Sequence, residues 1–316
     1  MRVLLWSYHT YPAYRANGDG VRTKPVPSGS GHVVHDCLAK GLTELGHEVF
    51  YFLRGGAESS LFPGITQVSE ARSDVDIFHN LESDTVPWVK TYHLDKELLG
   101  VTADEVPRNA IFVSESLAAS YGRARFVRNG IDPADFIFSE AKDDYLLFIA
   151  SMDRHLGKGL DVALSLSREL DFKLVVLGAS RFQEIVNEVT ELCRASGVTY
   201  LGDVRGTKKA ELFAGAKALL LPTRLNEGCP LVIAEALMSG TPVICSDKGA
   251  CPEMVSPDVG FVCKDHEDYV EAINRIDDIS PRDCRDKAMR DYHYLRMTAD
   301  YVKEYEREIR GETVCD

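Results

Sequence analysis

The chain has 316 residues, of which 45% are hydrophobic and 27% are charged, and this composition excludes the disordered, collagen-like and low-complexity classes. At about 150 residues per domain, the length suggests two domains. The 36 lysine and arginine residues are outnumbered by 49 acidic residues, so the net charge is −13. Because nucleic acids are bound by basic surfaces, this balance argues against a nucleic acid as the partner.

Eight cysteines are distributed along the chain, without a CxxC pair and without a Cys/His cluster at zinc spacing. A chain of this size buries enough surface to fold without disulfides, so we expect free thiols in a reducing cytoplasm. The apolar run Val3–Trp6 is too short for a signal peptide or a membrane span. The sequence therefore predicts a cytoplasmic protein, and contact with a membrane is not favoured.

Short apolar runs alternate with helix-period segments along the chain, which predicts an α/β protein with parallel sheets. A long loop from Ser7 to about Gly31 is expected to precede a helix that ends at Gly46. The strands expected in the first half are Val3–Trp6, Glu48–Leu53, Val75–His79, Trp88–Tyr92 and Ala110–Ser114.

The polar stretch 132–144 is the predicted linker, and the alternation of strands and helices restarts after it. The strands expected in the second half are Tyr145–Ala150, Phe172–Leu177, Ala218–Leu221 and Pro242–Cys245; the helices are Lys158–Leu170, a helix from Pro230 to Gly240, and a tail from Asp283 to Arg310. Ligands of such sheets bind at the carboxyl ends of the strands, and two halves facing each other would form a cleft between domains.

The most informative stretch runs from Asn226 to Ala236. Glu227 is expected in the loop before a helix, and Glu235 about a turn and a half inside that helix. Between them, the amides of Gly228 to Val232 would form a helix amino terminus that binds anions or sugar hydroxyls. A nucleotide-sugar carries both phosphates and hydroxyls, so it would suit amides and carboxylates together. The alternative is that both glutamates are solvent-facing acids near a helix start.

Glu227 and Glu235, with seven residues between them, resemble the E-x7-E signature of the family 4 retaining glycosyltransferases, and the resemblance continues to Gly260-Phe261. The family has the GT-B fold, which is α/β with two Rossmann-like doubly wound domains facing across a cleft. The resemblance implies an acceptor-side domain over residues 1–135 and a nucleotide-sugar donor domain over 140–285. A helix at about 290–316 would cross back to the first domain.

Further motifs resemble the family in order along the chain. Lys158 beside Gly159 resembles the lysine that holds the donor diphosphate, and Thr91-Tyr92-His93 resembles a T-x-H beside the transferred sugar. Asn129–Asp132 resembles the N-G-I-D of the domain junction. The family's usual Gly-Arg is here Ala150-Ser151, so Arg154 is the candidate replacement for the phosphate arginine. The alternative for Lys158 is a solvent-exposed lysine at the start of a helix. The alternative for His93 is a histidine at a strand end whose ring is hydrogen-bonded to the backbone.

The candidate site residues fall into three groups, of which the resemblance implies the first two and the distinctive loop from Ser7 to Pro27 suggests the third. The catalytic group is Glu227, His93, Lys158 and Arg154; the donor-binding group is Glu235, Gly228, Cys229, Pro230, Leu231, Val232, Gly202, Asp203, Val204, Gly29, Ser30 and Gly31; the acceptor group is Tyr11, Tyr14 and Arg15. Glu227 is expected to bind the donor hexose, Glu235 the ribose, and Gly202–Val204 the base. Asp74 and Asp76 match an Asp-x-Asp pattern but open a predicted strand, so no metal site is expected.

The implied reaction is a metal-independent transfer of a hexose, with retention, from a nucleoside-diphosphate sugar to an acceptor hydroxyl. A UDP-sugar comes first as the donor and GDP-mannose second, with no cofactor and with a small, soluble acceptor. One alternative is a GT-B sugar-nucleotide epimerase, which would convert its donor without an acceptor. The other is a non-catalytic protein that binds a nucleotide-sugar.

Overall fold

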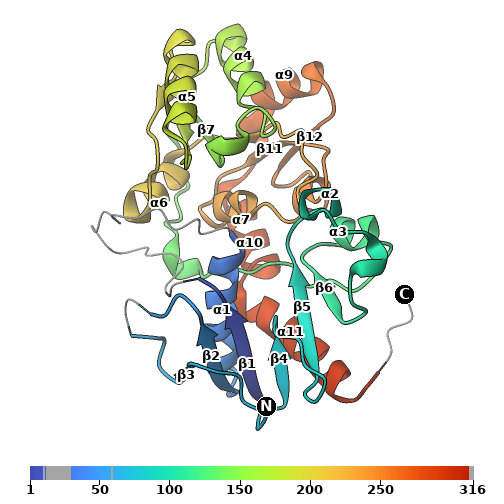
Figure 1. Ribbon diagram of the computed structural model, residues 1–316. Helices are drawn as coiled ribbons and strands as arrows, with labels where there is room; N and C mark the ends of the chain where they lie inside the picture. Colours follow the sequence, from blue (N-terminus) through green and yellow to red (C-terminus); the bar gives the residue numbers. More distant parts are fainter. Residues whose placement is uncertain (10, 12–29, 58–59, 313–316) are drawn as a thin grey trace. The chain divides into compact units, whose positions relative to one another are not determined.

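The computed structural model describes residues 1–9, 11, 30–57 and 60–312 (Figure 1). They group into two compact units. The first holds the described residues up to Asp132 together with those from Asp291 onwards, and the second is built from Pro133–Arg290. Each unit contains one six-stranded sheet in which neighbouring strands are parallel.

The sheet of the first unit has the order β3-β2-β1-β4-β5-β6, which is the strand order of a Rossmann domain. Its strands are β1 (Arg2–Ser7), β2 (Glu48–Leu53), β3 (Ile65–Val68), β4 (Ile77–His79), β5 (Trp88–Tyr92) and β6 (Ala110–Phe112). Its helices are α1 (Ser30–Glu44), α2 (Lys96–Leu99), α3 (Glu115–Ser120) and α11 (Tyr294–Ile309), with a 3₁₀ turn at Ala103–Glu105.

The central strand β1 is apolar because both faces of a parallel sheet are covered. Val3, Leu4 and Leu5 are completely buried, and α1 packs on β1 and β2 (Figure 1). Gly46 has a φ of +82°, so the predicted left-handed stop after α1 is confirmed.

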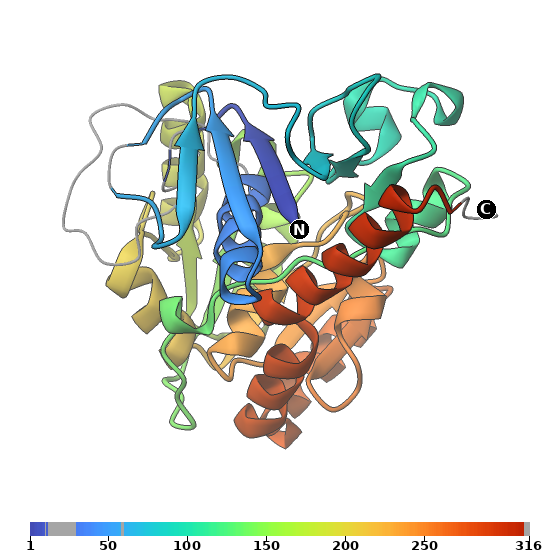
Figure 2. The same ribbon diagram turned by 90° about the horizontal axis from the view of Figure 1, so that it is seen from below.

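Helix α11, red in Figure 2, packs against α1 and β5. Tyr305 and Tyr301 are buried on it; the hydroxyl of Tyr305 lies 2.5 Å from His79 Nδ1. Between these two tyrosines on the helix, Glu304 Oε2 accepts a hydrogen bond from Arg125 Nε at 2.5 Å, and both side chains are at least nine-tenths buried. These polar contacts join the last helix to β4 and to the loop that follows α3.

The sheet of the second unit, β12-β11-β10-β7-β8-β9, repeats the same order. Its strands are β7 (Leu146–Ile149), β8 (Leu174–Leu177), β9 (Thr199–Tyr200), β10 (Ala218–Leu221), β11 (Val243–Ser246) and β12 (Gly260–Cys263). Its helices are α4 (Leu160–Leu170), α5 (Gln183–Ala195), α6 (Gly206–Gly215), α7 (Leu231–Met238), α8 (Cys251–Met254), α9 (His266–Arg275) and α10 (Pro281–Asp291), with 3₁₀ turns at Pro133–Asp135, Met152–Arg154 and Ile276–Asp278.

The prediction of one continuous tail helix is wrong. The helix is interrupted after Asp291, where Ile131 N donates to Tyr292 O at 2.8 Å and Tyr294 N donates to Ile131 O at 3.1 Å. This strand-like pairing takes the backbone groups that a continuous helix would need, and His293 then caps α11 through its ring.

The seven described cysteines are all buried, and none of these seven is in a disulfide. Among the residues described, none of the helices combines the length and the apolar character needed to span a bilayer.

Replacing Gly41 of α1 by alanine should destabilise the protein, although glycine-to-alanine changes inside helices ordinarily stabilise by about 1 kcal/mol. A Cβ on Gly41 would overlap Oγ1 of Thr298 on α11. Such overpacking costs about 1–3 kcal/mol, which chemical unfolding would measure. Adding Thr298→Ala removes the overlapping hydroxyl and should recover part of the loss. A Gly41→Ala protein as stable as the wild type would contradict this close packing.

Candidate active site

The loops that follow the two central strands of the second sheet, β7 and β10, lie at the same edge of that sheet. The strand order reverses between the neighbouring strands β7 and β10, and ligands of such sheets bind beside the carboxyl ends at that point. The loop after β7 contains Arg154 and Lys158, and the loop after β10 contains Glu227. Residues 69 positions apart in the sequence are therefore brought together by the topology of the sheet.

Lys158 and Glu227 form an ion pair at this point. The lysine Nζ donates to Oε1 at 2.6 Å and to Oε2 at 2.8 Å, and Thr223 Oγ1 donates to Oε1 at 2.8 Å. Only 14% of the lysine side chain and 10% of the glutamate side chain are exposed. The carboxylate thus holds a fixed position between a cation and a hydroxyl.

Two glycines in left-handed conformations bring the surrounding loops close to this pair. A Cβ on Gly159, whose φ is +81°, would collide with the carbonyl of Pro222. A Cβ on Gly249, whose φ is +56°, would collide with the backbone N and O of Glu227. The next amide, Ala250 N, donates to Glu227 O at 2.8 Å. The backbone at Glu227 is therefore fixed by the loop that follows β11.

Glu235 lies on α7 and pairs with a lysine that the sequence analysis did not single out. Lys209 Nζ on α6 donates to its Oε1 at 3.0 Å and to its Oε2 at 2.9 Å. The side chains are 17% and 15% exposed. Each carboxylate of the E-x7-E pattern therefore has its own lysine.

Part of the segment that leads into α7 is buried against the rest of the second unit. Pro230 is the residue before the helix, Leu231 is buried, and the Cys229 thiol is buried against Met254 at 3.9 Å between the sulfurs. Gly228 and Val232 are half-buried. Cys229 is therefore a packing residue, and Gly228 is the position at which the backbone is more open.

The loop expected to hold the base follows β9. The carbonyl oxygen of Gly202 accepts a hydrogen bond from Gly178 N at 2.9 Å. One of the two lone pairs of this oxygen is therefore already engaged within the protein. Asp203 is exposed and pairs with Arg205 at 2.6 Å, and Val204 is half-buried. The side of this loop that remains open carries Asp203 and Val204.

Arg154 ends a 3₁₀ turn, and its carbonyl accepts a hydrogen bond from Lys158 N at 2.9 Å. Its side chain is exposed, and within the described part of the chain the guanidinium makes no ion pair. It therefore offers a second cation one turn from Lys158.

In the first unit, the structure brings together His93 and Gly31. His93 follows β5 and is half-buried, and a Cβ on Gly31 of α1 would lie 3.3 Å from its Cδ2. Ser30 is the first residue of α1. Tyr11 is half-buried, with its ring 6.4 Å from that of Tyr51. The predicted site residues Gly29, Tyr14 and Arg15 lie outside the described residues.

A cluster of histidines surrounds His93, and the sequence analysis missed it. The rings of His9 and His32 stack with centroids 4.8 Å apart, and those of His35 and His79 lie 5.4 Å apart. Nδ1 of His32 and Nε2 of His35 are buried without a hydrogen-bond partner among the described residues. In the described part of the chain, no three His, Cys, Asp or Glu side chains come together in a way that could hold a metal ion.

Burial keeps four histidines of the cluster, His32, His35, His79 and His93, neutral at physiological pH. Burial, reinforced by neighbouring histidines, lowers the pKa of His32 and of His93 to about 4 and that of His79 to about 3. The pKa of His35 is also lowered well below its usual value, for the same reasons. His93 is therefore a neutral group that can exchange hydrogen bonds with hydroxyls, and it carries no positive charge for a phosphate.

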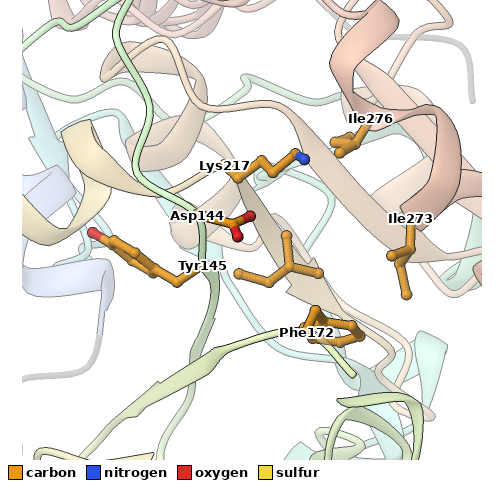
Figure 3. Close-up of a pocket in the computed structure, with 7 residues that line it drawn as sticks. Asp144, Tyr145, Phe172, Lys217, Ile273 and Ile276 are labelled. Atoms are coloured by element: carbon orange, nitrogen blue, oxygen red, sulfur yellow. The ribbon is translucent and has the colours of Figure 1, made fainter. Parts of the chain in front are cut away.

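A cavity of about 50 Å³ lies elsewhere in the second unit (Figure 3). Its lining residues Tyr145, Phe172 and Lys217 precede β7, β8 and β10, so it lies at the amino ends of these strands. This is the edge of the sheet opposite Lys158 and Glu227, and the volume is far below that of a typical ligand site.

Replacing Gly249 by alanine should lower the free energy of unfolding, because the residue combines a positive φ with a collision at the Glu227 backbone. Gly197→Ala is the matched control: its φ is +69°, but a Cβ there would meet nothing within 4 Å. We expect about 1–2 kcal/mol of backbone strain in both variants and about 1–3 kcal/mol more in Gly249→Ala. Equal losses in chemical unfolding would show that the collision is relieved at no cost.

The histidine cluster should make the stability fall in mild acid. Because the folded-state pKa values lie below 6.5, the unfolded state binds more protons between about pH 6.5 and 4, and the free energy of unfolding rises with pH there. Each such histidine contributes at most about 1.4 kcal/mol per pH unit. His35→Gln should flatten the dependence in chemical unfolding across this range, whereas His266→Gln, on the surface, should not. A slope unchanged by His35→Gln would contradict this explanation.

The family model described as “Glycosyl transferases group 1” matches residues 134–291, which is half of the chain. The MMP alpha-(1->4)-mannosyltransferase of Mycolicibacterium hassiacum is 32% identical over 118 residues, covering 34% of this chain and 28% of that protein. The O-antigen chain mannosyltransferase RfbU of Salmonella typhimurium is 25% identical over 174 residues, covering 53% and 49%. The chain thus spans less than half the length of these curated relatives.

Solved structures match almost the whole chain. AviGT4, a glycosyltransferase involved in avilamycin A biosynthesis, has a TM-score of 0.78 and 25% identity over 99% of both chains. HepE of Anabaena, solved in complex with UDP, has a TM-score of 0.68 and 14% identity, covering 97% of this chain and 100% of that one. The two six-stranded parallel sheets are those of GT-B glycosyltransferases. The chain belongs to the glycosyl transferases group 1 family and has the GT-B fold.

Proposed function

We propose that this protein is a glycosyltransferase that moves a hexose, with retention, from a nucleoside-diphosphate sugar bound by the second unit. The observation that supports this most is the arrangement of Glu227 and Glu235. Glu227 lies in the loop before α7 and Glu235 lies on α7, and each carboxylate is held by a lysine, Lys158 or Lys209. Hydroxyls bind to carboxylates, and phosphates bind to lysines and helix amides.

The diphosphate is the leaving group, and negative charge grows on it as the bond to the sugar breaks. Lys158 and Arg154 are the cations proposed to stabilise that charge, together with the amides at the start of α7. This would make a metal ion dispensable. Glu227 is proposed to bind the hexose hydroxyls, and its contact with Lys158 would couple the position of the sugar to that of the phosphates.

The nucleoside is proposed to lie along the loops next to α6 and α7. Gly202, Asp203 and Val204 would contact the base, and Glu235 the ribose. A UDP-sugar is our first candidate donor, which the UDP complex of HepE supports, and GDP-mannose is the second. The names of the two curated relatives support mannose as the sugar.

The acceptor is proposed to bind to the first unit. His93 is neutral and half-buried, so its ring suits a hydrogen bond to an acceptor hydroxyl. The O-antigen mannosyltransferase relative supports a glycan acceptor, and a small soluble molecule remains our other candidate.

A thermal-shift panel with UDP, GDP and ADP, alone and as their sugars, tests the donor site. A ligand at about 100 times its Kd adds about 2.7 kcal/mol of stability, a shift of a few degrees for a chain of this size. We expect one nucleotide to stabilise the wild type, and Glu235→Ala to lose that shift. Glu211→Ala, an exposed acid on α6, is the control and should keep it. A panel without any shift would overturn the proposed donor site.

A further inference from the structure

Two lysines follow one another on α6, and the structure gives them different surroundings. Lys208 is 66% exposed and reaches Glu211 on its own helix at 3.5 Å. Lys209 is 17% exposed and contacts both oxygens of Glu235 on the neighbouring helix α7. The ring of Phe213, one turn further along α6, lies 5.5 Å from the Lys209 amine. The amine is thus held between an aromatic ring and a carboxylate.

We propose that Lys209 is a positioning residue for the donor: it orients the carboxylate of Glu235 toward the two ribose hydroxyls of the nucleotide. This inference rests on the proposed function, in which Glu235 binds the ribose. It adds a residue to the donor site from α6, the helix that directly follows the loop proposed to hold the base.

The geometry leaves Glu235 with the acceptor capacity that a ribose needs. Each carboxylate oxygen can accept about two hydrogen bonds. Lys209 takes one position on each oxygen, at 3.0 and 2.9 Å, and so faces the carboxylate symmetrically. One acceptor position on each oxygen remains, which matches the two neighbouring hydroxyls of a ribose. Hydrogen bonds to a charged acceptor such as a carboxylate are the stronger ones.

The chain supplies its own control for removing this charge. Lys208→Met deletes the same charge from the same helix at the adjacent position, but leaves the contact with Glu235 in place. Lys209→Met deletes the contact, and Lys209→Arg keeps a cation there. Lys209→Gln is the reserve variant, because it keeps a polar group if the methionine variant does not fold.

The experiment compares binding of UDP and 2′-deoxyuridine diphosphate by calorimetry, or GDP and 2′-deoxyguanosine diphosphate if the panel selects guanine. We expect the wild type and Lys208→Met to prefer the ribonucleotide by about tenfold or more, the effect of a hydrogen bond to a charged group. Lys209→Met should lose affinity for the ribonucleotide by about tenfold and keep that for the deoxynucleotide, so that the preference disappears. Lys209→Arg should restore part of it.

A purely structural role for Lys209 predicts a different result. If the pair only ties α6 to α7, Lys209→Met should weaken both nucleotides equally and lower the stability without ligand, which would overturn the inference. Unchanged binding of both nucleotides would also overturn it. In a transfer assay, the positioning role predicts that KM for the donor rises while kcat stays nearly constant.

Glu235→Gln separates this inference from the function on which it rests. If Glu235→Gln loses the preference for the ribonucleotide and Lys209→Met keeps it, the ribose assignment stands and the inference about Lys209 fails. If Glu235→Gln keeps the full preference, the assignment of the ribose to Glu235 fails, and the inference fails with it.

Discussion

The candidate donor site depends on one ion pair, between Lys158 and Glu227, and that pair depends on the order of strands in the second sheet. All carboxyl ends of a parallel sheet lie at one edge, and the reversal between β7 and β10 separates the helices that follow them. The two loops can therefore approach each other there. Two oppositely charged side chains, both mostly buried, are stable only as partners, since removing either would leave a buried charge. The pair thus fixes the loops as well as the charges.

The two units hold different kinds of polar groups at their candidate sites. The second unit uses fixed charges, with two lysine–glutamate pairs and an exposed arginine. The first unit uses neutral histidines around His93, whose lowered pKa values follow from burial. Fixed cations suit the proposed diphosphate leaving group, which would become more negative as its bond to the sugar breaks. Neutral rings suit an uncharged hydroxyl, because they exchange hydrogen bonds with it without attracting a competing anion.

The sequence predicted the buried strands well, because their apolar runs are continuous: Glu48–Leu53 and Trp88–Tyr92 have the predicted bounds. It missed β3, β9 and β12, which are edge strands of two to four residues, and β3 and β9 also have exposed positions. In the site, the sequence predicted Glu227, Glu235 and Lys158, the partner of Glu227, but it did not predict Lys209, the partner of Glu235. Nothing in the sequence separates Lys208 from Lys209, because only the packing of α6 on α7 decides which lysine faces Glu235. The histidine cluster was missed because its members are scattered over three strand ends and one helix.

The return of α11 to the first sheet has a consequence for the order in which the protein can be made. Among the described residues, the second unit is one continuous stretch, Pro133–Arg290, and in the sequence it lies between the segments that build the first unit. His79 meets Tyr305 across 226 positions and Arg125 meets Glu304 across 179. During synthesis, the first sheet must therefore wait for the whole second unit to leave the ribosome before its buried polar groups find their partners. Contacts this distant in sequence slow folding, and the unfinished first unit exposes surface that chaperones would have to cover.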